Sequence, residues 1–298
     1  MSAVHQPAKV DDAAAARHAA IKRVLWWILV ANWAVAGLKV ALGWIAGSTA
    51  MTADGLHSFI DGASNIIGLV AMHFASQPAD AEHPYGHQKF EALASLAIGV
   101  MIGMGVLELG RMAIDALVHD KHPDVGPLQI AVMVTTLAVN LAVTRYERRR
   151  GEQLKSGLLL ADAAHTLSDV FVTSAVIISL LLTWAGIPRV DGGVALAVLV
   201  FVAWTGWGIV RQSVGILADS SRIDPVKVRE ALGDVAEVRS LGAIRSRGLE
   251  GAVYVDLVVL VDPQLSVVRA HEVADQVETR IKSTWPEVID VVVHVEPA

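Results

Sequence analysis

The chain has 298 residues, 54% of them hydrophobic, a formal net charge of -6 and no cysteine. Its mean hydropathy of +0.51 is higher than a soluble protein of ordinary composition has. The acidic balance excludes a basic surface for nucleic acid, and the lack of cysteine excludes disulfides and thiolate metal ligands. The composition therefore predicts an α-helical membrane protein in which any metal site uses nitrogen and oxygen ligands.

Six apolar segments are long enough to cross a bilayer as helices. They cover residues 23–46, 49–76, 90–118, 126–146, 156–186 and 190–213. Lysine or arginine lies before the first segment, between the second and third, between the fourth and fifth, and after the sixth, whereas the connectors on the opposite side contain only Lys121 and Arg189. Because positive charge marks the cytoplasmic side of membrane helices, both termini are expected in the cytoplasm. Residues 1–20 are predicted to be a cytoplasmic tail without the layout of a signal peptide, and residues 21–214 the membrane domain.

Residues 215–298 are predicted to form a small cytoplasmic α+β domain. Asp224-Pro225 begins a helical pattern, and the β-branched run from Val253 to Val261 indicates a strand. Apolar residues recur at helical spacing between Val267 and Ile281, and a final strand alternates from Ile289 to Val295. The order helix, strand, strand, helix, strand predicts a ferredoxin- or metallochaperone-like domain with its helices on one face of a sheet.

Two stretches of the apolar sequence repeat the pattern A-D-x-x-H-[ST]-x-x-D, at residues 53–61 and 161–169. Each places a histidine and an aspartate four residues apart, on one face of a helix. The two segments are predicted to cross the membrane in opposite directions, so that all four side chains can converge on one ion. These residues are His57, Asp61, His165 and Asp169. Two imidazoles and two carboxylates suit tetrahedral Zn²⁺. Hydrogen bonding between packed helices is the alternative, which the duplication disfavours.

Further candidate ligands and acids flank these blocks. Asp54 and Asp162 precede the two histidines by three residues, and they are expected either to line the two access routes or a proton path, or to lie at helix interfaces. The connector after the second segment contains Asp80, His83 and His87 in a short loop shaped by proline and glycine. These three side chains either bind a second ion or belong to a solvated polar loop.

Together these features resemble the cation diffusion facilitator family, and most closely its bacterial FieF-like zinc/iron efflux members. The match covers the six segments, the two blocks, the loop Q-P-A-D-x-x-H-x-[FY]-G-H and the ending H-x-[DE]-P. The resemblance implies a homodimeric secondary transporter of the bacterial inner membrane, not an enzyme, that exchanges a divalent cation for protons. It makes the four block residues the transport site and the loop residues a second site. Lys89 and Asp219 match a charged pair at the dimer interface of the family.

Two departures from the FieF-like pattern affect the predicted metal sites. His57 stands where those members usually have aspartate, which favours zinc over cadmium or iron. In the soluble domain, Gly242 and Val258 stand where the family often has histidine. These two residues disfavour a site for two zinc ions. What remains is either a weak single-ion site or a polar surface, formed by His271, His294 and Glu296.

The most specific function predicted is a Zn²⁺/H⁺ antiporter that exports zinc from the cytoplasm by alternating access across the lipid bilayer. An exporter of Fe²⁺, Co²⁺, Cd²⁺ or Mn²⁺ remains open, because water can complete a higher coordination number at the same residues. A membrane metalloenzyme is disfavoured because the chain lacks an H-E-x-x-H pair. A metal sensor that does not transport is the remaining alternative.

Overall fold

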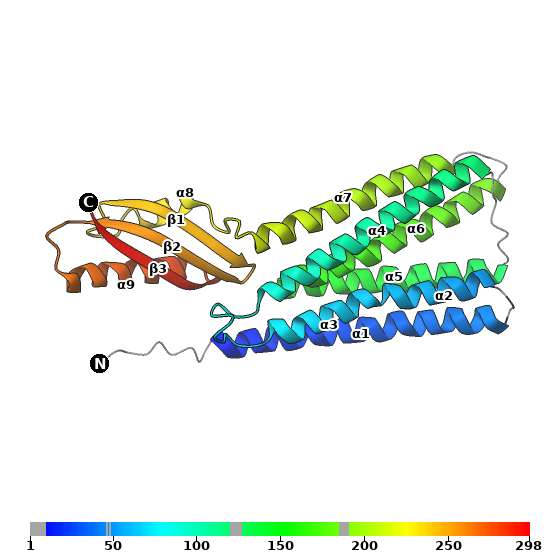
Figure 1. The fold of residues 1–298 in the computed structure, drawn as a ribbon, viewed down its shortest axis with the longest axis horizontal. Coiled ribbons are helices and arrows are strands. Elements are labelled where there is room, and N and C mark those ends of the chain that lie inside the picture. Colours follow the sequence, from blue (N-terminus) through cyan, green and yellow to red (C-terminus); the bar gives the residue numbers. More distant parts are fainter. Residues whose placement is uncertain (1–9, 46, 48, 120–126, 185–190) are drawn as a thin grey trace. The chain divides into compact units, whose positions relative to one another are not determined.

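A computed structural model describes residues 10–45, 47, 49–119, 127–184 and 191–298 of the chain. The chain divides into two compact units, one comprising Asp11–Ser213 and the other including Val214–Ala298. In the described part, the first unit is a bundle of helices and the second combines a sheet with helices (Figure 1). The predicted fold class, six membrane helices followed by an α+β domain, is confirmed.

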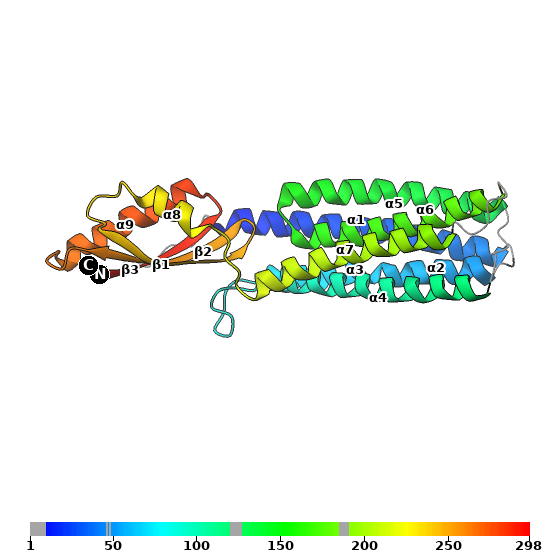
Figure 2. The same cartoon turned by 90° about the horizontal axis from the view of Figure 1, so that it is seen from above.

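The first unit consists of long helices that run alongside one another (Figures 1 and 2). In chain order they are α1 (Val10–Ile45), α2 (Thr49–Asp61), α3 (Ala63–Ala75), α4 (Lys89–His119), α5 (Pro127–Leu154), α6 (Gly157–Trp184) and α7 (Asp191–Leu217). Within the described residues, six stretches are long and apolar enough to cross a membrane, and the second of them, Ser58–Ala75, takes in the end of α2 and all of α3.

The second membrane segment is interrupted at Gly62. This residue keeps right-handed helical angles, with φ of -61° and ψ of -10°, but separates α2 from α3. A Cβ atom at Gly62 would lie 2.6 Å from Nε1 of Trp33 on α1, so only glycine allows the two helices this approach. The Ser64 hydroxyl donates to the carbonyl of Asp61 at 3.1 Å. The sequence predicts one continuous segment over residues 49–76, and the structure divides it into two helices at this glycine, with Ser58–Ala75 still counted as one membrane stretch.

The inside of the helical unit is apolar, and so is much of its outside. Ile21, Leu25, Met72, Ile98 and Leu158 are fully buried or nearly so in one core. Large apolar side chains also remain exposed around the bundle, including Trp27, Trp44, Leu107, Val200 and Trp204. Such a surface is unfavourable in water and favourable against lipid tails. The exposure pattern therefore agrees with a multi-pass membrane protein.

The connection between α5 and α6 is much shorter than the sequence indicates. The fourth segment is predicted to end at residue 146, but α5 continues to Leu154 and α6 begins at Gly157. The arginine-rich stretch is therefore helical, and Arg148 donates to Glu152 one turn later at 3.1 Å. The extension brings Glu147, which composition alone assigns to a solvated connector, into the interior, where it is 0% exposed.

A buried ion pair ties this connection to two other helices. Arg17 of α1 contacts Glu91 at the start of α4, with Nη1 and Oε2 3.0 Å apart. The Ser156 hydroxyl donates to the other Glu91 oxygen at 2.6 Å, and Arg17 Nε donates to the carbonyl of Leu154 at 2.8 Å. The network therefore fixes one end of the bundle at the junction of α1, α4, α5 and α6.

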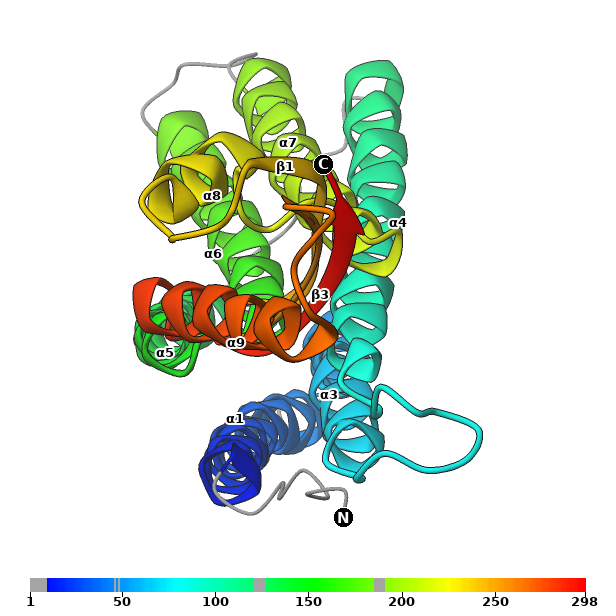
Figure 3. The ribbon, with the colours of Figure 1, turned by 90° about the vertical axis from the view of Figure 1, so that its left-hand side faces the viewer.

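The second unit is a three-stranded sheet with two helices on one face (Figures 2 and 3). Its elements are α8 (Pro225–Leu232), β1 (Ser240–Leu249), β2 (Ala252–Val261), α9 (Val267–Thr284) and β3 (Val288–Pro297). Strand β2 pairs antiparallel with β1 and parallel with β3. The Asp224 side chain accepts from the Val226 backbone at 2.9 Å and caps α8. The predicted order of helices and strands is confirmed.

The core of this unit follows the alternation of β2. Val255, Leu257 and Val259 are buried, while the residues between them are half-buried on the other face. Val273 and Val277 of α9 pack against the buried face at helical spacing. The half-buried positions of β2, including Val258, therefore belong to the sheet face that α8 and α9 leave uncovered.

Candidate metal site

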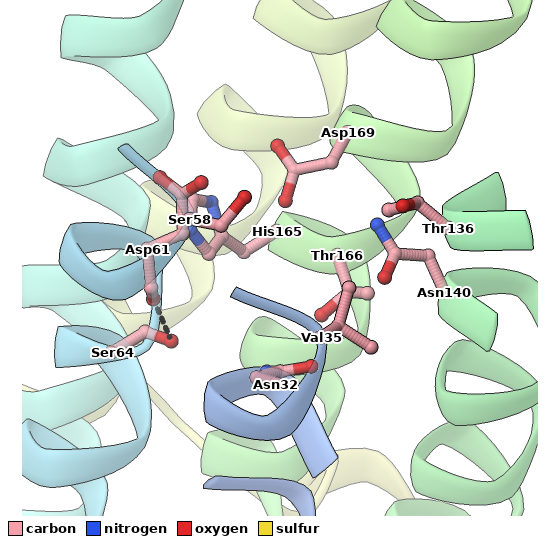
Figure 4. A pocket seen from close by; sticks show the side chains of 10 residues that line it. All are labelled: Asn32, Val35, Ser58, Asp61, Ser64, Thr136, Asn140, His165, Thr166 and Asp169. Carbon is pink, nitrogen blue, oxygen red and sulfur yellow. Dashed lines mark hydrogen bonds between the residues drawn. The ribbon is translucent and has the colours of Figure 1, made fainter. Parts of the chain in front are cut away.

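Residues of both sequence blocks line one cavity of about 40 Å³ in the helical unit. Asp61 comes from α2, and His165 and Asp169 come from α6. Figure 4 shows the side chains of these residues around the cavity with polar side chains of α1, α3 and α5. The other polar lining residues are Asn32, Ser58, Ser64, Thr136, Asn140 and Thr166. A cavity of this size can hold water or an ion, since one water needs roughly 10–15 Å³.

The chemistry of the lining suits a cation. Nε2 of His165 is buried and has no hydrogen-bond partner, which is costly unless something binds to it. Two carboxylates stand beside the imidazole in the same lining. Nitrogen and carboxylate oxygen are both ligands of zinc and other transition metals. The ligand atoms of Asp61, His165 and Asp169 are not gathered within 4.8 Å of one another, so the side chains surround the space without closing on it.

Two of the predicted residues have side chains outside the described part of the structure. His57 and Asp54 both lie on the backbone of α2, but the positions of their side chains are not among the described ones. Asp61 is one helical turn after His57, which puts both residues on the same face of α2. The participation of His57 in the site therefore stays a prediction.

The loop between α3 and α4 gathers three ligand-type side chains. Within the described residues, Asp80, His83 and His87 form the group whose ligand atoms all lie within 4.8 Å of one another. Asp80 lies 3.4 Å from Nδ1 of His83 and 3.5 Å from Nε2 of His87. Nδ1 of His87 is 3.1 Å from the carbonyl of Pro78, which fixes the ring and favours a proton on that nitrogen. Nε2 is then the nitrogen able to bind a metal.

The loop also sets the charge of its carboxylate. The backbone N–H of His83 donates to Asp80 at 2.6 Å, and that of Glu82 donates at 2.9 Å. These bonds, led by the one from His83, lower the pKa of Asp80 below its ordinary value. The carboxylate therefore stays ionised, as a metal ligand must, and the short loop is preorganised around it.

Comparison with known proteins decides between a transporter, a metalloenzyme and a metal sensor. The model of the cation efflux transmembrane domain matches residues 25–218, and that of the cation efflux protein cytoplasmic domain matches residues 221–298. The cation-efflux pump FieF of Cronobacter sakazakii is 30% identical over 264 residues, covering 87% of either chain. The manganese efflux system protein MneS of Bacillus subtilis is 30% identical over 269 residues, covering 88% of this chain and 91% of MneS. Metal tolerance protein C1 of Arabidopsis thaliana is 31% identical over 289 residues, covering 91% of this chain and 61% of that protein.

The chain belongs to the cation efflux family. It is a divalent metal cation efflux transporter of the cation diffusion facilitator class and not an enzyme. The resemblance inferred from the repeated blocks is confirmed. The relatives include a pump for manganese, so the family alone leaves the identity of the transported ion to be decided by the chemistry of the site.

The three candidate ligands in the soluble part of the transporter are exposed and are not gathered into one group within the described chain. Nε2 of His294 is 3.3 Å from Glu296, while His271 on α9 is 3.9 Å from Asp275. Val258 pairs with His294 across β2 and β3, and a Cβ atom at Gly242 would lie 3.0 Å from that of Val258. Of the neighbouring positions 242, 258 and 294, only the last therefore carries an imidazole. A metal site shared between two protomers stays a prediction.

The predicted interface charges lie at the ends of helices. Lys89 is the first residue of α4, and Asp219 follows α7 with a φ of 56°, in the left-handed region. Both make interactions within the structure. Their pairing with each other stays a prediction.

Several buried polar residues of the helical unit were not predicted. Lys39 of α1 is 7% exposed and donates to Ser58 at 3.0 Å, which places a cation beside the cavity lining. Asn32 donates to Asn65 at 3.1 Å, and Asn65 donates in turn to Asp162. Asp162, which is expected from the sequence on an access route or proton path or at a helix interface, is 1% exposed at this position. The available signal was the same for each of these residues, a polar or charged side chain within an apolar segment.

Proposed function

We propose that this transporter exports zinc from the cytoplasm in exchange for protons, and that His57, Asp61, His165 and Asp169 bind the ion during transport. The observation that supports the proposal is the cavity that Asp61, His165 and Asp169 share, with an unpartnered imidazole nitrogen in its lining. His57, one turn before Asp61, adds the fourth ligand. Two imidazoles favour zinc over ions that prefer an all-oxygen environment.

Proton exchange follows from the chemistry of these ligands. Imidazole and carboxylate bind a metal only when they are deprotonated, so that metal and protons compete for the same atoms. Entry of zinc from the cytoplasmic side releases protons, and protonation from the other side releases zinc. The side chains surround the cavity loosely, so ion binding draws them together. Movement of α2 and α6 against their neighbours then alternates access to the site, as in other secondary transporters.

We infer that Asp80, His83 and His87 form a second metal site at the end of α3, used on the cytoplasmic side. Its supporting observation is the spacing of the three ligand atoms within 4.8 Å. We further infer that the transporter is a homodimer in a bacterial inner membrane with both termini in the cytoplasm. The match of residues 221–298 to the cytoplasmic domain of cation efflux proteins and the position of the positively charged connectors support this arrangement.

The transport proposal is tested in vesicles made with the purified protein. Zinc added on one side should move across the membrane and drive protons in the opposite direction, followed with a zinc dye and a pH dye. His165→Ala should abolish both movements while the protein still elutes as a folded dimer. Glu152→Gln, which neutralises an acid of α5 whose side chain is 58% exposed, is the control that keeps both. Undiminished zinc movement in His165→Ala vesicles would place the transport site elsewhere.

The choice of zinc is tested at His57. Replacing it with aspartate creates a site with one imidazole and three carboxylates, which suits manganese better than the native set does. The ratio of zinc to manganese transport should fall in His57→Asp when both ions are offered together. A ratio that stays unchanged would mean that His57 does not contact the ion, whatever the transporter carries.

A further inference from the structure

Glu147 of α5 and Asp162 of α6 form a buried carboxyl pair in the helical unit, apart from the cavity. Their exposed fractions are 0% and 1%. Asp162 lies close enough to Glu147, across the interface between α5 and α6, for the two carboxyl groups to act on each other. Neither residue lines the cavity that Asp61, His165 and Asp169 share.

The pair lacks the donors that two ionised carboxylates need. Both oxygens of Glu147 and Oδ1 of Asp162 are buried without a hydrogen-bond partner. The amide of Asn65 donates to the remaining oxygen of Asp162. Two carboxyl groups can hydrogen-bond to each other only if one of them carries a proton. A fully ionised pair would instead bury two adjacent negative charges, which is strongly unfavourable.

The surrounding helices provide no cation that replaces this proton within the described residues. Arg150 lies on α5 one turn after Glu147. Its Nη1 donates to Gln153 at 3.1 Å, and its buried Nε has no hydrogen-bond partner, so that it pairs with neither carboxyl group. Of the neighbouring helices, α3 provides the neutral Asn65, and α4 provides Glu91, which is already paired with Arg17. On α6, the titratable neighbour is His165, three residues after Asp162.

We propose that Glu147 and Asp162 share one proton and constitute a proton-binding site separate from the metal ligands. The role of this site in transport rests on the proposed exchange of metal for protons. Asp162 and His165 are about 4.5 Å apart along the axis of α6. At that separation in a low-dielectric interior, a divalent cation on the ligands weakens the hold of the pair on its proton. The O–H bond then breaks, the proton passes to water, and the charge of the pair changes from -1 to -2.

The coupling is reciprocal. If metal in the cavity expels the shared proton, then a protonated pair lowers the affinity of the cavity for metal by the same factor. A proton that enters at Glu147 and Asp162 thus helps to release the ion without occupying a ligand atom. Metal export is coupled to this proton in addition to those that compete directly for the imidazoles and carboxylates of the site.

Infrared spectroscopy of the purified full-length protein at about pH 7 tests for the proton directly. The wild type should show the carbonyl-stretch band of a protonated carboxylic acid, and that band should be lost in both Glu147→Gln and Asp162→Asn. Both substitutions keep the size of the side chain, and either alone is sufficient if the other does not fold. Glu152→Gln is the matched control, because Glu152 lies on the same helix with its side chain 58% exposed. The band should remain in this control.

Addition of zinc should decrease the band in the wild type and in Glu152→Gln. A wild-type spectrum without a protonated-acid band, or a band that survives in Glu147→Gln, would overturn the proposal. So would the loss of one bound zinc per chain in Glu147→Gln, since the pair would then be a metal site.

Vesicles containing the same variants distinguish this proposal from the proposed function. Glu147→Gln should still carry zinc down its gradient, but a pH gradient should accelerate that movement less than in the wild type. If zinc movement in the wild type does not depend on the pH gradient while the infrared band is present, metal–proton exchange is refuted and the proton site stands. If zinc movement in the wild type depends on the pH gradient but the infrared band is absent, the proton site alone is refuted.

Discussion

Asp61 and Asp169 line the same cavity, although three helices separate α2 from α6 in the chain. Each follows a histidine by four residues, in the two copies of one sequence pattern. The repeated pattern therefore corresponds to one place in the fold, where its two acids and the imidazole of His165 line a space large enough for an ion. Metal binding at the cavity and at the loop leads to predictions that differ in their pH dependence and in their sensitivity to single substitutions.

The contribution of Asp80 to metal binding is predicted to be independent of pH near neutrality. Backbone donors, with His83 first, lower the pKa of Asp80, so the carboxylate remains ionised as the pH falls from about 7 to 6. Asp80→Asn should weaken metal binding at the loop by about tenfold or more, judged from the 10–100-fold cost of losing groups that merely support a ligand. Calorimetric titration at the two pH values should give the same ratio of wild-type to variant affinity.

Glu82→Gln provides the control for this experiment. Glu82 is an exposed acid of the same loop, and its part in holding Asp80 comes from its backbone N–H, which the substitution leaves intact. Its affinity for metal should match that of the wild type. An effect of Asp80→Asn that vanishes at the lower pH would mean that the carboxylate becomes protonated in this range, contrary to the geometry of the loop.

The sheet of the soluble unit is predicted to gain a metal site when an imidazole is restored on it. Val258 and His294 are register partners on β2 and β3, so a histidine at position 258 would stand beside His294 and Glu296. Gly242 leaves room next to it. Val258→His should bind one more zinc per chain than the wild type in equilibrium dialysis, and Val258→Ala should not. Equal zinc contents in the two variants would show that these positions do not form a site.

The ion pair between Arg17 and Glu91 is predicted to contribute strongly to stability. The side chain of Glu91 is 3% exposed and that of Arg17 25% exposed, and loss of one partner of a buried pair costs about 3–5 kcal/mol. Glu91→Gln should therefore clearly lower the temperature at which the protein unfolds in detergent. In the exposed pair Arg148–Glu152 the side chains are 68% and 58% exposed, and Glu152→Gln should cost no more than about 1 kcal/mol. Similar shifts in both variants would mean that the Arg17 network does not fix the bundle.

Hydrophobic length predicted the six membrane segments, and three residues of the repeated block line the cavity. The repeated block by itself indicates a functional site. An ionisable side chain within an apolar membrane segment is costly, and this chain contains the same costly pattern twice. The strand of the soluble unit from Val253 to Val261 was equally clear, since this stretch is rich in β-branched residues.

Glu147 shows what the sequence pattern could not predict. It lies in the run Tyr146-Glu147-Arg148, whose charges are typical of a connector, and only the continuation of α5 to Leu154 brings it inside the bundle. Its partner Asp162 is distant in sequence, so their juxtaposition depends on how α5 packs against α6. The close approach of Gly62 to the Trp33 ring likewise depends on how α1 packs against α2 and α3. Packing of this kind is a tertiary property that local periodicity does not contain.

The most direct test of the central claim is the location of zinc in crystals of the full-length protein soaked at saturating concentration. Anomalous scattering at the zinc edge should give a peak within the cavity, between α2 and α6, in contact with Asp61, His165 and Asp169. Peaks at the loop alone, with the cavity empty at saturation, would contradict the claim that this cavity is where the transporter binds its ion.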